Sequence, residues 1–492
     1  MKSIQITLAA LLLLLVAACN ATKLAQNENG GIGGTGISTG RISNFGSIFV
    51  NGVEYDVDSA DFTRNDLLES NQQSYRIGEY VVVEGDVNPD GVTGKASKVN
   101  FSRSLQGNVT TVSSDGTTLA VMGQPVRSNV LTVFYGFNNI RDLTTTDKVE
   151  VSGVQNALGE WIATSIRKLT QSGEDWEVKG TIQHLDSSNQ TFAVGGLTVA
   201  YGNAALHDLP NDIPEVGQFI RARSQQALSG MRMDASEVRL TSPTPTLSVG
   251  TKIRLEGVIT RFTNSTNFAV NGLDAITTSG TRFGEGTAND LSLNALLEME
   301  GTVAADGIIM ANNVKVKESA SISISLIQGA VSDIDSSTQQ LTLGEGTTAT
   351  IIVVDSATLW EDKTDIPASP MNFNTLNNGN YLQAQVKRGN DGQWLALRVT
   401  RTEPPPVTNT FGGLVNSVEL TSQQFIIGEG TTATTLLVDA ATTWLDSTAL
   451  AISPMSLNHL NTGNSLTVQA QQRSDGKWLA LNVTRTNIGT PP

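Results

Sequence analysis

Short segments in which apolar and polar residues alternate recur along most of the chain. Alternation with a period of two predicts half-buried β-strands, each with one face toward a core. Examples are residues 48–50, 119–121 and 149–151. No long segment shows the 3.6-residue period of an amphipathic helix. The pattern therefore predicts an all-β protein.

These strands are arranged in six repeats of one unit. Each repeat opens with a glycine, any residue, and then Val or Ile, and successive opening glycines lie 67, 73, 77, 72 and 84 residues apart. A second alternating strand, a later alternating strand, a turn that contains glycine and a closing strand follow in the same order each time. The opening glycines are Gly40, Gly107, Gly180, Gly257, Gly329 and Gly413. The turns lie at Asp90-Gly91, Gly159, Gly230, Asp306-Gly307, Asp391-Gly392 and Asp475-Gly476.

The fifth and sixth repeats are a recent duplication. They align without gaps at an offset of 84, and 38 of 74 positions are identical between residues 329–402 and 413–486. Proline-rich segments at residues 242–246 and 403–406 separate the third repeat from the fourth and the fifth from the sixth. Such segments favour extended, semi-rigid spacers.

Five strands in about 70 residues must hide their edges, which favours closure into a barrel. Three strands, a longer connection and a hairpin match a small Greek-key barrel of OB type; small open sandwiches and β-rolls are the alternatives. A short helix or loop is expected between the third and fourth strands, for instance at residues 61–75 and 203–214. The predicted fold is all-β, a tandem array of six small OB-like five-stranded β-barrel domains after a signal peptide and a flexible tether. The predicted segments are 1–18 (signal), 19–39 (tether), 40–104, 105–174, 175–245, 249–317, 321–403 and 408–488.

The N-terminus carries an export signal. Lys2 precedes an apolar stretch at residues 8–18 that is too short to cross a bilayer as a helix. The sequence Leu-Val-Ala-Ala-Cys at residues 15–19 resembles the bacterial lipobox, and Cys19 is the only cysteine of the chain. The resemblance implies cleavage before Cys19 and acylation of that residue, so that the acyl chains attach the protein to a membrane. Because Asn20 rather than Asp follows the cysteine, the outer membrane of a bacterial envelope is the expected location.

The Gly-rich run at residues 30–36 is interpreted as part of a flexible spacer, with a packing or export role as the alternative. A phosphate-binding loop would need a strand before it, a helix after it and a Lys-Ser/Thr pair, none of which the sequence predicts here. Nucleotide binding is therefore not expected.

Composition narrows the classes of function further. The formal net charge is −15, which opposes nucleic acid as a partner. One cysteine excludes a disulfide framework, and three histidines, His184, His207 and His459, leave little material for metal sites or acid–base catalysis. We expect no cofactor, no metal site and no enzymatic activity.

Residues 31–56, which include Gly-Arg-Ile-Ser-Asn-Phe-Gly-Ser-Ile-Phe-Val-Asn-Gly from Gly40, resemble the start of bacterial lipoproteins built from repeats of the domain of unknown function 5666. The repeat signature extends the resemblance to Thr486. The fifth and sixth repeats differ by longer second and third strands and by a Trp-containing insertion. The resemblance implies an exported β-repeat protein without an assigned activity, and it brings no catalytic residues.

Three features of the sequence have the composition of binding sites. Residues 86–91 match the first half of a calcium loop but also coincide with the recurring hairpin turn, and position twelve is Ser97 rather than Glu. The duplicated loops at 344–350 and 428–434 are interpreted as Gly-rich strand connections. Trp161, Trp394 and Trp478 each follow the hairpin turn; we expect them to cover a barrel end, while Trp394 and Trp478 are the candidates for stacking on a glycan.

The sequence thus predicts a non-enzymatic, lipid-anchored envelope protein that displays tandem β-domains to a protein or glycan partner. One alternative is a structural spacer of the envelope without a specific ligand. Another is an array of carbohydrate-binding modules centred on the last two repeats.

Overall fold

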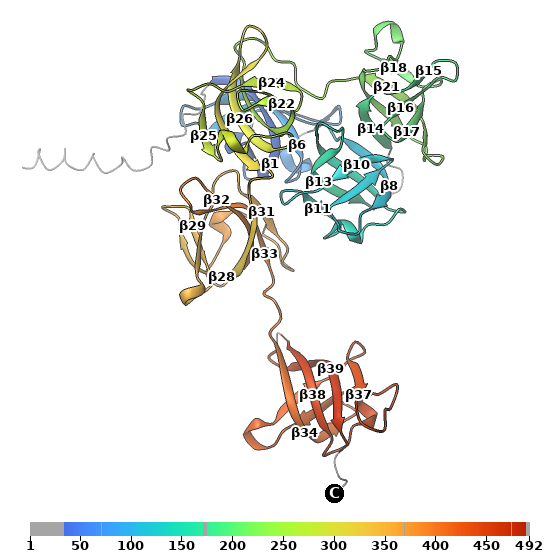
Figure 1. Cartoon of the computed structure of the whole chain (residues 1–492), viewed down its shortest axis with the longest axis vertical. Coiled ribbons are helices and arrows are strands. Elements are labelled where there is room, and N and C mark those ends of the chain that lie inside the picture. Colours follow the sequence, from blue (N-terminus) through green and yellow to red (C-terminus); the bar gives the residue numbers. More distant parts are fainter. Residues whose placement is uncertain (1–33, 70, 171–174, 369, 474, 489–492) are drawn as a thin grey trace, which may run out of the picture. The chain divides into compact units, whose positions relative to one another are not determined.

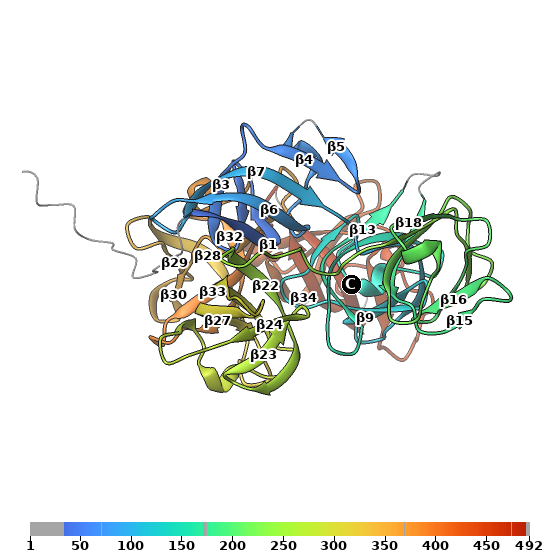
Figure 2. The ribbon, with the colours of Figure 1, turned by 90° about the horizontal axis from the view of Figure 1, so that it is seen from above.

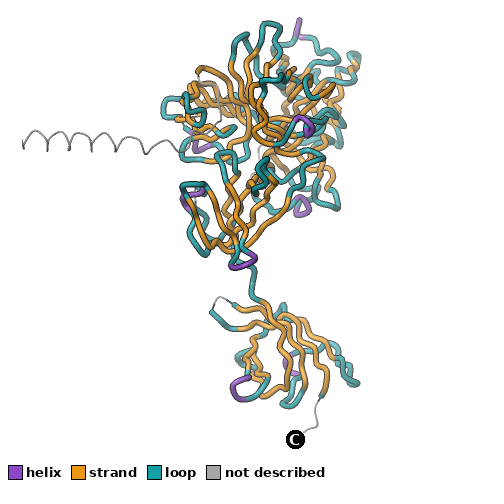
Figure 3. The backbone as a smooth tube through the Cα atoms, turned by 60° about the vertical axis from the view of Figure 1, so that its left-hand side comes forward, coloured by secondary structure: helices purple, strands orange, loops and turns teal. Residues whose placement is uncertain are grey.

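The computed structural model describes residues 34–488, except residues 70, 171–174, 369 and 474. The predicted signal peptide, Cys19 and the tether up to residue 33 lie outside this part. Strands make up the regular structure of the described residues, and their helices are short 3₁₀ turns (Figure 3). The turns are η1 (Gln72–Ser74), η2 (Ile140–Asp142), η3 (Pro210–Asp212), η4 (Ala288–Asp290), η5 (Gly346–Thr348), η6 (Phe373–Thr375), η7 (Gly430–Thr432) and η8 (Leu457–His459). The predicted all-β class is confirmed.

The first repeat is a sheet of five strands closed on itself. β1 pairs with β2, β2 with β3, β3 with β7, β7 with β6, and β6 again with β1. Only the β3–β7 pairing of this circuit is parallel, which gives the strand order of an OB-type barrel. The strands are β1 (Gly34–Asn44), β2 (Ile48–Val50), β3 (Val53–Asp56), β4 (Asp61–Arg64), β5 (Leu67–Glu69), β6 (Tyr80–Val87) and β7 (Thr93–Phe101).

The same circuit closes in strands β8–β13, β22–β27, β28–β33 and β34–β39 (Figure 1). In the third repeat the circuit is interrupted, because the first strand is divided into β14 and β15 and the closing strand into β20 and β21. Tandem five-stranded barrels, as predicted, are therefore confirmed.

The strands of the second and third repeats are β8 (Leu105–Val112), β9 (Thr118–Val121), β10 (Gln124–Arg127), β11 (Val133–Tyr135), β12 (Lys148–Gln155), β13 (Trp161–Leu169), β14 (Trp176–Thr181), β15 (Leu185–Asp186), β16 (Thr191–Val194), β17 (Leu197–Ala200), β18 (Ala205–His207), β19 (Phe219–Ser224), β20 (Arg232–Asp234) and β21 (Glu237–Leu240). Those of the fourth are β22 (Lys252–Asn264), β23 (Asn267–Val270), β24 (Leu273–Ile276), β25 (Arg282–Glu285), β26 (Leu296–Val303) and β27 (Ile309–Glu318). Those of the fifth and sixth are β28 (Ser325–Asp335), β29 (Gln340–Leu343), β30 (Thr350–Val353), β31 (Leu359–Asp362), β32 (Tyr381–Arg388), β33 (Trp394–Thr402), β34 (Thr408–Glu419), β35 (Gln424–Ile427), β36 (Thr434–Leu437), β37 (Thr443–Asp446), β38 (Ser465–Gln472) and β39 (Trp478–Asn487).

The segment between the third and fourth barrel strands differs from the expected helix or loop. In each repeat it contains a short strand parallel to the closing strand and then a 3₁₀ turn. The reason is visible in the first repeat, where β3 covers only residues 93–95 of β7 and β4 pairs with residues 98–101. The extra strand thus covers an edge of the closing strand that would otherwise stay open.

The opening glycine makes room for the turn between the second and third strands. A Cβ on Gly40 would overlap the Asn51 side chain, and one on Gly257 would overlap that of Asn271. On Gly107 it would overlap Met122. The turn folds directly over the first strand, and this close approach explains the recurrence of glycine at that position.

The predicted hairpin turns are confirmed. The glycines Gly91, Gly159, Gly230, Gly307, Gly392 and Gly476 all have a positive φ, as tight turns require. At the sequence that resembles a calcium loop, the Asp90 carboxylate accepts the N–H groups of Val92 and Thr93 at 3.0 Å each and the Thr93 hydroxyl at 2.6 Å. Its oxygens therefore stabilise the turn itself.

Buried apolar side chains form separate cores in the first, fourth, fifth and sixth repeats, while the second and third repeats share one continuous core. At the larger scale the chain forms two compact units, residues 1–402 and 403–492. The boundary falls at the Pro-rich segment before the sixth repeat. Six separate domains with the limits given above remain a prediction.

Within the first unit, barrels join through their first strands. β1 pairs in parallel with β22, Gly36 with Lys252 through Thr39 with Leu255, so that the first and fourth repeats share one sheet (Figure 2). β8 pairs with β14 over two residues and joins the second and third repeats.

The predicted tether ends too late. Residues 34–39 belong to β1, where they pair with β6 on one side and, from Gly36, with β22 on the other. A Cβ on Gly36 would overlap the carbonyl oxygen of Lys252. The glycines of this stretch resemble a flexible linker in composition, but Gly36 permits close contact between two strands.

Gly36→Ala is therefore expected to weaken the β1–β22 joint and to lower the free energy of unfolding of the first unit by about 1–3 kcal/mol, as overpacking does. Urea unfolding measures the change. Gly280→Ala is the matched control, because its Cβ would meet only the Thr278 hydroxyl at 3.6 Å. Equal stability of the two variants would refute the account of Gly36.

Candidate functional site

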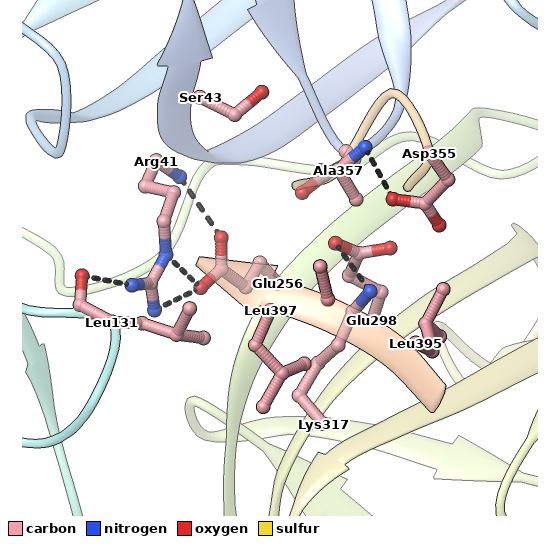
Figure 4. A pocket seen from close by; sticks show the side chains of 12 residues that line it. Arg41, Ser43, Leu131, Glu256, Glu298, Lys317, Asp355, Ala357, Leu395 and Leu397 are labelled. Carbon is pink, nitrogen blue, oxygen red and sulfur yellow. Dashed lines mark hydrogen bonds and ion pairs between the residues drawn. The ribbon is translucent and has the colours of Figure 1, made fainter. Parts of the chain in front are cut away.

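A buried ion pair joins the first and fourth repeats and reaches the second (Figure 4). The Arg41 guanidinium donates to Glu256 Oε1 at 2.6 Å and to the Leu131 carbonyl at 2.7 Å, and the Arg41 backbone N–H donates to Glu256 Oε2 at 3.1 Å. Both side chains are less than 10% exposed. The adjoining cavity has a volume of about 20 Å³, room for about one water molecule. This cluster is a structural joint between barrels.

A second buried network joins the fourth and fifth repeats. Lys387 on β32 contacts Glu285 on β25 at 2.6 Å and donates to the Val316 carbonyl, while Lys317 on β27 lies 3.4 Å from Glu285 and 3.5 Å from Glu298. Burial alone would raise the pKa of Glu285, but the charges of Lys317, Lys387 and Lys315 outweigh it and lower that pKa to about 2.

A third network connects the first three repeats. Arg103, in the connection between β7 and β8, binds Asp175 at 2.9 Å and Glu177 at 3.2 Å. Arg223 on β19 reaches Glu177 at 2.7 Å, and Arg221 pairs with Asp66 in the β4–β5 turn. The three networks hold neighbouring barrels in defined positions within the first unit.

Beside the third network lies a cleft of about 710 Å³, a volume typical of small-molecule sites. Its walls come from the first four repeats and from the connection at residues 242–246. β1, β6, β12, β14, β19 and β22 all contribute to it. No single repeat contains the cleft, which exists because four barrels are fixed around it.

Uncharged polar side chains dominate the lining. Hydroxyls and amides from different repeats face the cleft, among them Asn100, Ser102, Gln155, Asn156, Thr181 and Asn271. Each can donate and accept hydrogen bonds. Apolar and aromatic surface is supplied by side chains that include Tyr80, Trp161 and Phe219.

The charged groups of the cleft are few. Lys179 Nζ donates to the Ser102 hydroxyl at 2.6 Å. Burial lowers the pKa of Lys179 to about 8; Glu177 and Asp66 oppose this shift and Arg221 adds to it. Arg221 and Arg239 lie in the same wall, and Asp66 and Glu84 are the carboxylates of the lining.

Two buried donors of the lining have no acceptor among the described residues. They are Trp161 Nε1 and Arg221 Nε, on side chains that are almost fully buried. Buried donors normally have a partner, so these two atoms are exceptions within the wall of the cleft.

The tryptophans predicted from the sequence lie where expected, at the first positions of β13, β33 and β39. Trp161 is buried, whereas Trp394 and Trp478 are half-buried. The Arg388 guanidinium lies over the Trp394 ring at 3.7 Å, and Phe411 packs edge-on against Trp478 with 4.8 Å between ring centroids. Trp394 and Trp478 lie on separate units, and stacking of a glycan on Trp394 would require Arg388 to move.

Other features singled out in the sequence do not come together. The duplicated Gly-rich loops contain η5 and η7 and connect strands. His459 Nδ1 lies 3.0 Å from the Ser456 hydroxyl, and no group of three or more potential metal-ligating side chains occurs in the part of the chain that the structure describes. No helix among the described residues has the length and apolar character needed to span a bilayer. Cys19 lies outside the described residues.

The cleft itself was missed by sequence reasoning. Its lining residues are scattered from Ile37 to Leu273, and many are ordinary Ser, Thr, Asn and Gln of strands and connections. The one available signal was the charge pattern Glu177, Lys179, Arg221 and Arg223, which alternate with apolar or small residues along two strands of the third repeat.

These features define a class, proteins built from tandem OB-like β-barrels. The domain of unknown function DUF5666 matches residues 106–167, 256–315, 328–400 and 413–484, more than half of the chain. The chain therefore belongs to the DUF5666 family, as its resemblance suggested. The matches include the fifth and sixth repeats, whereas residues 31–56, which carried the resemblance, lie outside them.

The solved structures that match include drosophila Unr CSD456, with 11% sequence identity over 48% of this chain and 98% of that chain. The TM-score is 0.20, so this likeness carries no argument about arrangement or binding. A comparison with the curated proteins found no match.

The Glu285 network predicts a pH dependence of stability. Because folding lowers the pKa of Glu285 from its usual 4.5 to about 2, its stabilisation is complete above pH 4.5 and is lost as the pH falls toward 2. The full effect is about 3 kcal/mol. Urea unfolding at pH 7 and pH 3 should show about 2 kcal/mol of this effect, because at pH 3 the Glu285 carboxyl is still mostly ionised in the folded state.

Glu285→Gln should destabilise the first unit at pH 7 and should reduce the difference in the free energy of unfolding between pH 7 and pH 3. Asp274→Asn is the control, because Asp274 forms an exposed pair with Arg261 and its loss should cost less than about 1 kcal/mol. An unchanged pH dependence in Glu285→Gln would show that other carboxylates cause the loss.

Proposed function

We propose that this protein is a non-enzymatic, lipid-anchored protein of the bacterial envelope that presents tandem OB-like barrels to an external partner. The cleft of the first four repeats is the proposed binding site. The observation that carries the proposal is the cleft of about 710 Å³ lined by hydroxyl and amide side chains of four barrels.

The lining favours a glycan over a protein partner. Sugar hydroxyls both donate and accept hydrogen bonds, as do the side chains of Asn100, Gln155, Asn156 and Thr181. The low charge of the lining suits an uncharged ligand, and Lys179 offers one cation for an acidic group.

The second candidate is a structural spacer. It is favoured by the buried ion pairs and shared strands that fix the first five repeats into one compact unit. A spacer needs this rigidity but does not need the cleft. Filling the cleft should therefore abolish the function of a binding protein and leave the function of a spacer unchanged.

The anchor is tested at Cys19. Cys19→Ala removes the acylated side chain, so the exported protein should no longer fractionate with membranes, and processing should lose its sensitivity to globomycin. Two acyl chains contribute about 0.8 kcal/mol for each buried methylene, enough for stable attachment. An equally membrane-bound Cys19→Ala protein would remove lipid anchoring from the proposal.

The cleft is tested by filling it. Thr181 is exposed and lines the cleft, so Thr181→Trp should block it and leave the fold intact. We expect the unmodified protein to bind a member of a panel of neutral and uronic-acid oligosaccharides in microcalorimetry. Thr181→Trp should weaken this binding by at least about tenfold.

Ser336→Trp, in an exposed turn of the fifth repeat, is the matched control and should bind as the unmodified protein does. Absence of binding by every oligosaccharide would favour the spacer, whereas equal binding by the two tryptophan variants would show that the ligand does not bind in the cleft. Thermal unfolding confirms that both variants are folded.

A further inference from the structure

The first strand of each barrel has one edge that its own barrel leaves open. In the sixth repeat, for example, the second half of β34 pairs with β35, whereas its first half pairs only on the opposite side, with β38. Peptide N–H and C=O groups of alternate residues in the first half therefore point away from the barrel.

The first four repeats cover these edges with one another. β1 is covered by β22, and β8 is covered by β14. The open edge of the first strand is thus used in two separate pairings between barrels within one chain.

The sixth repeat leaves the edge open among the described strands. β34 pairs only with β35 and β38. Val415 N–H donates to the Asn464 carbonyl, and Val407 accepts from Gln472 N–H, which places the odd-numbered residues toward β38. The peptide groups of Thr410 and Gly412 therefore face outward, and the Thr410 N–H donates to the neighbouring Asn409 Oδ1 at 2.8 Å rather than to another strand.

The first half of this strand lacks the charge and proline that usually protect an edge, and the bulge of β34 lies further along, between Val415 and Ser417. β34 contains no charged residue between Thr408 and Val418 and no proline. Thr408, Thr410, Gly412 and Leu414 are exposed. Natural edge strands are usually blocked by charge, proline or a bulge, so an open and uncharged edge favours pairing with another strand.

We propose that the open edge of β34 pairs with β34 of a second copy of this chain. The inference is independent of any ligand in the cleft and assigns self-association to the sixth repeat. The model for the pairing is the β8–β14 joint, which is antiparallel and therefore compatible with a closed two-fold dimer.

That joint also fixes the register. Gln106 lies opposite Glu177 and Leu105 opposite Val178. Counted back from the opening glycines Gly107, Gly180 and Gly413, these positions correspond to Gly412 opposite Thr410 and Phe411 opposite Phe411 of the second copy. The register is symmetric, and its hydrogen-bonded positions are those whose peptide groups face outward.

The residues at the centre permit close approach. A Cβ at Gly412 would meet only the Leu466 carbonyl oxygen, at 3.9 Å, so this side of the strand is unobstructed. The opposed Phe411 side chains would add a cross-strand aromatic pair.

The test measures self-association of the full chain carrying Cys19→Ala, which removes the acylated side chain, by sedimentation equilibrium. We expect a concentration-dependent dimer. Thr410→Pro removes an outward N–H that within the sixth repeat donates only to the Asn409 side chain, and it should weaken the dimer about a hundredfold. Thr410→Ala keeps the N–H and should associate as before.

A charge exchange tests the register without proline. Thr410→Lys with Gly412→Lys places like charges opposite each other, as does Thr410→Glu with Gly412→Glu. Each double variant should be monomeric alone, and an equimolar mixture should recover the dimer. Recovery on mixing also shows that both variants are folded.

Three results would overturn the proposal. One is a monomer at all concentrations, and another is a dimer that survives Thr410→Pro and both charge variants. The third is a dimer abolished by Gln328→Pro but not by Thr410→Pro, which would assign association to the corresponding open edge of β28 in the fifth repeat.

Discussion

The constraint on which this structure depends is the open edge of the first strand in a small closed barrel. A five-stranded barrel of about 70 residues has a modest core, and its first strand leaves half an edge of backbone groups without partners. In the first unit, pairing of β1 with β22 and of β8 with β14 covers part of these edges; the first pairing joins repeats distant in sequence and the second joins neighbouring repeats. The arrangement of the repeats follows from which edges meet.

The buried ion pairs add specificity to the arrangement that strand pairing produces. The last residues that pair between β1 and β22 are Thr39 and Leu255. Arg41, two residues further along β1, donates through its guanidinium and its backbone N–H to the carboxylate of Glu256, the residue after Leu255. A buried pair of this kind adds little net stability but makes misplacement costly, because either charge left alone is strongly unfavourable. The networks therefore specify the position of one barrel against the next. The cleft is what remains between barrels fixed in this way.

The sequence was sufficient for the features that depend on local periodicity. The repeats, the strand order, the glycine turns and the positions of Trp161, Trp394 and Trp478 at the start of the closing strand are all carried by spacing along the chain. The contacts between barrels could not be predicted in this way. Alternation indicates which face of a strand is buried, but it gives no information about the edges of the strand. Residues 34–39 illustrate the limit: their glycines have the composition of a linker and the function of a contact strand. The cleft escaped for the same reason, since its residues acquire a common role only after four barrels have assembled.

The buried ion pairs between barrels also determine where the net charge of the chain lies. Arg41, Arg103, Arg221, Lys317 and Lys387 lie in the joints with side chains at most 10% exposed, and carboxylates accompany them. Because each internal pair is neutral, the formal charge of −15 falls on a surface with fewer cations than the composition suggests. Such a surface repels phosphate backbones and polyanionic glycans at long range, an effect that salt screens. An uncharged polyhydroxyl ligand meets no such barrier, so the electrostatics of the surface and the hydroxyl and amide lining of the cleft favour the same kind of partner.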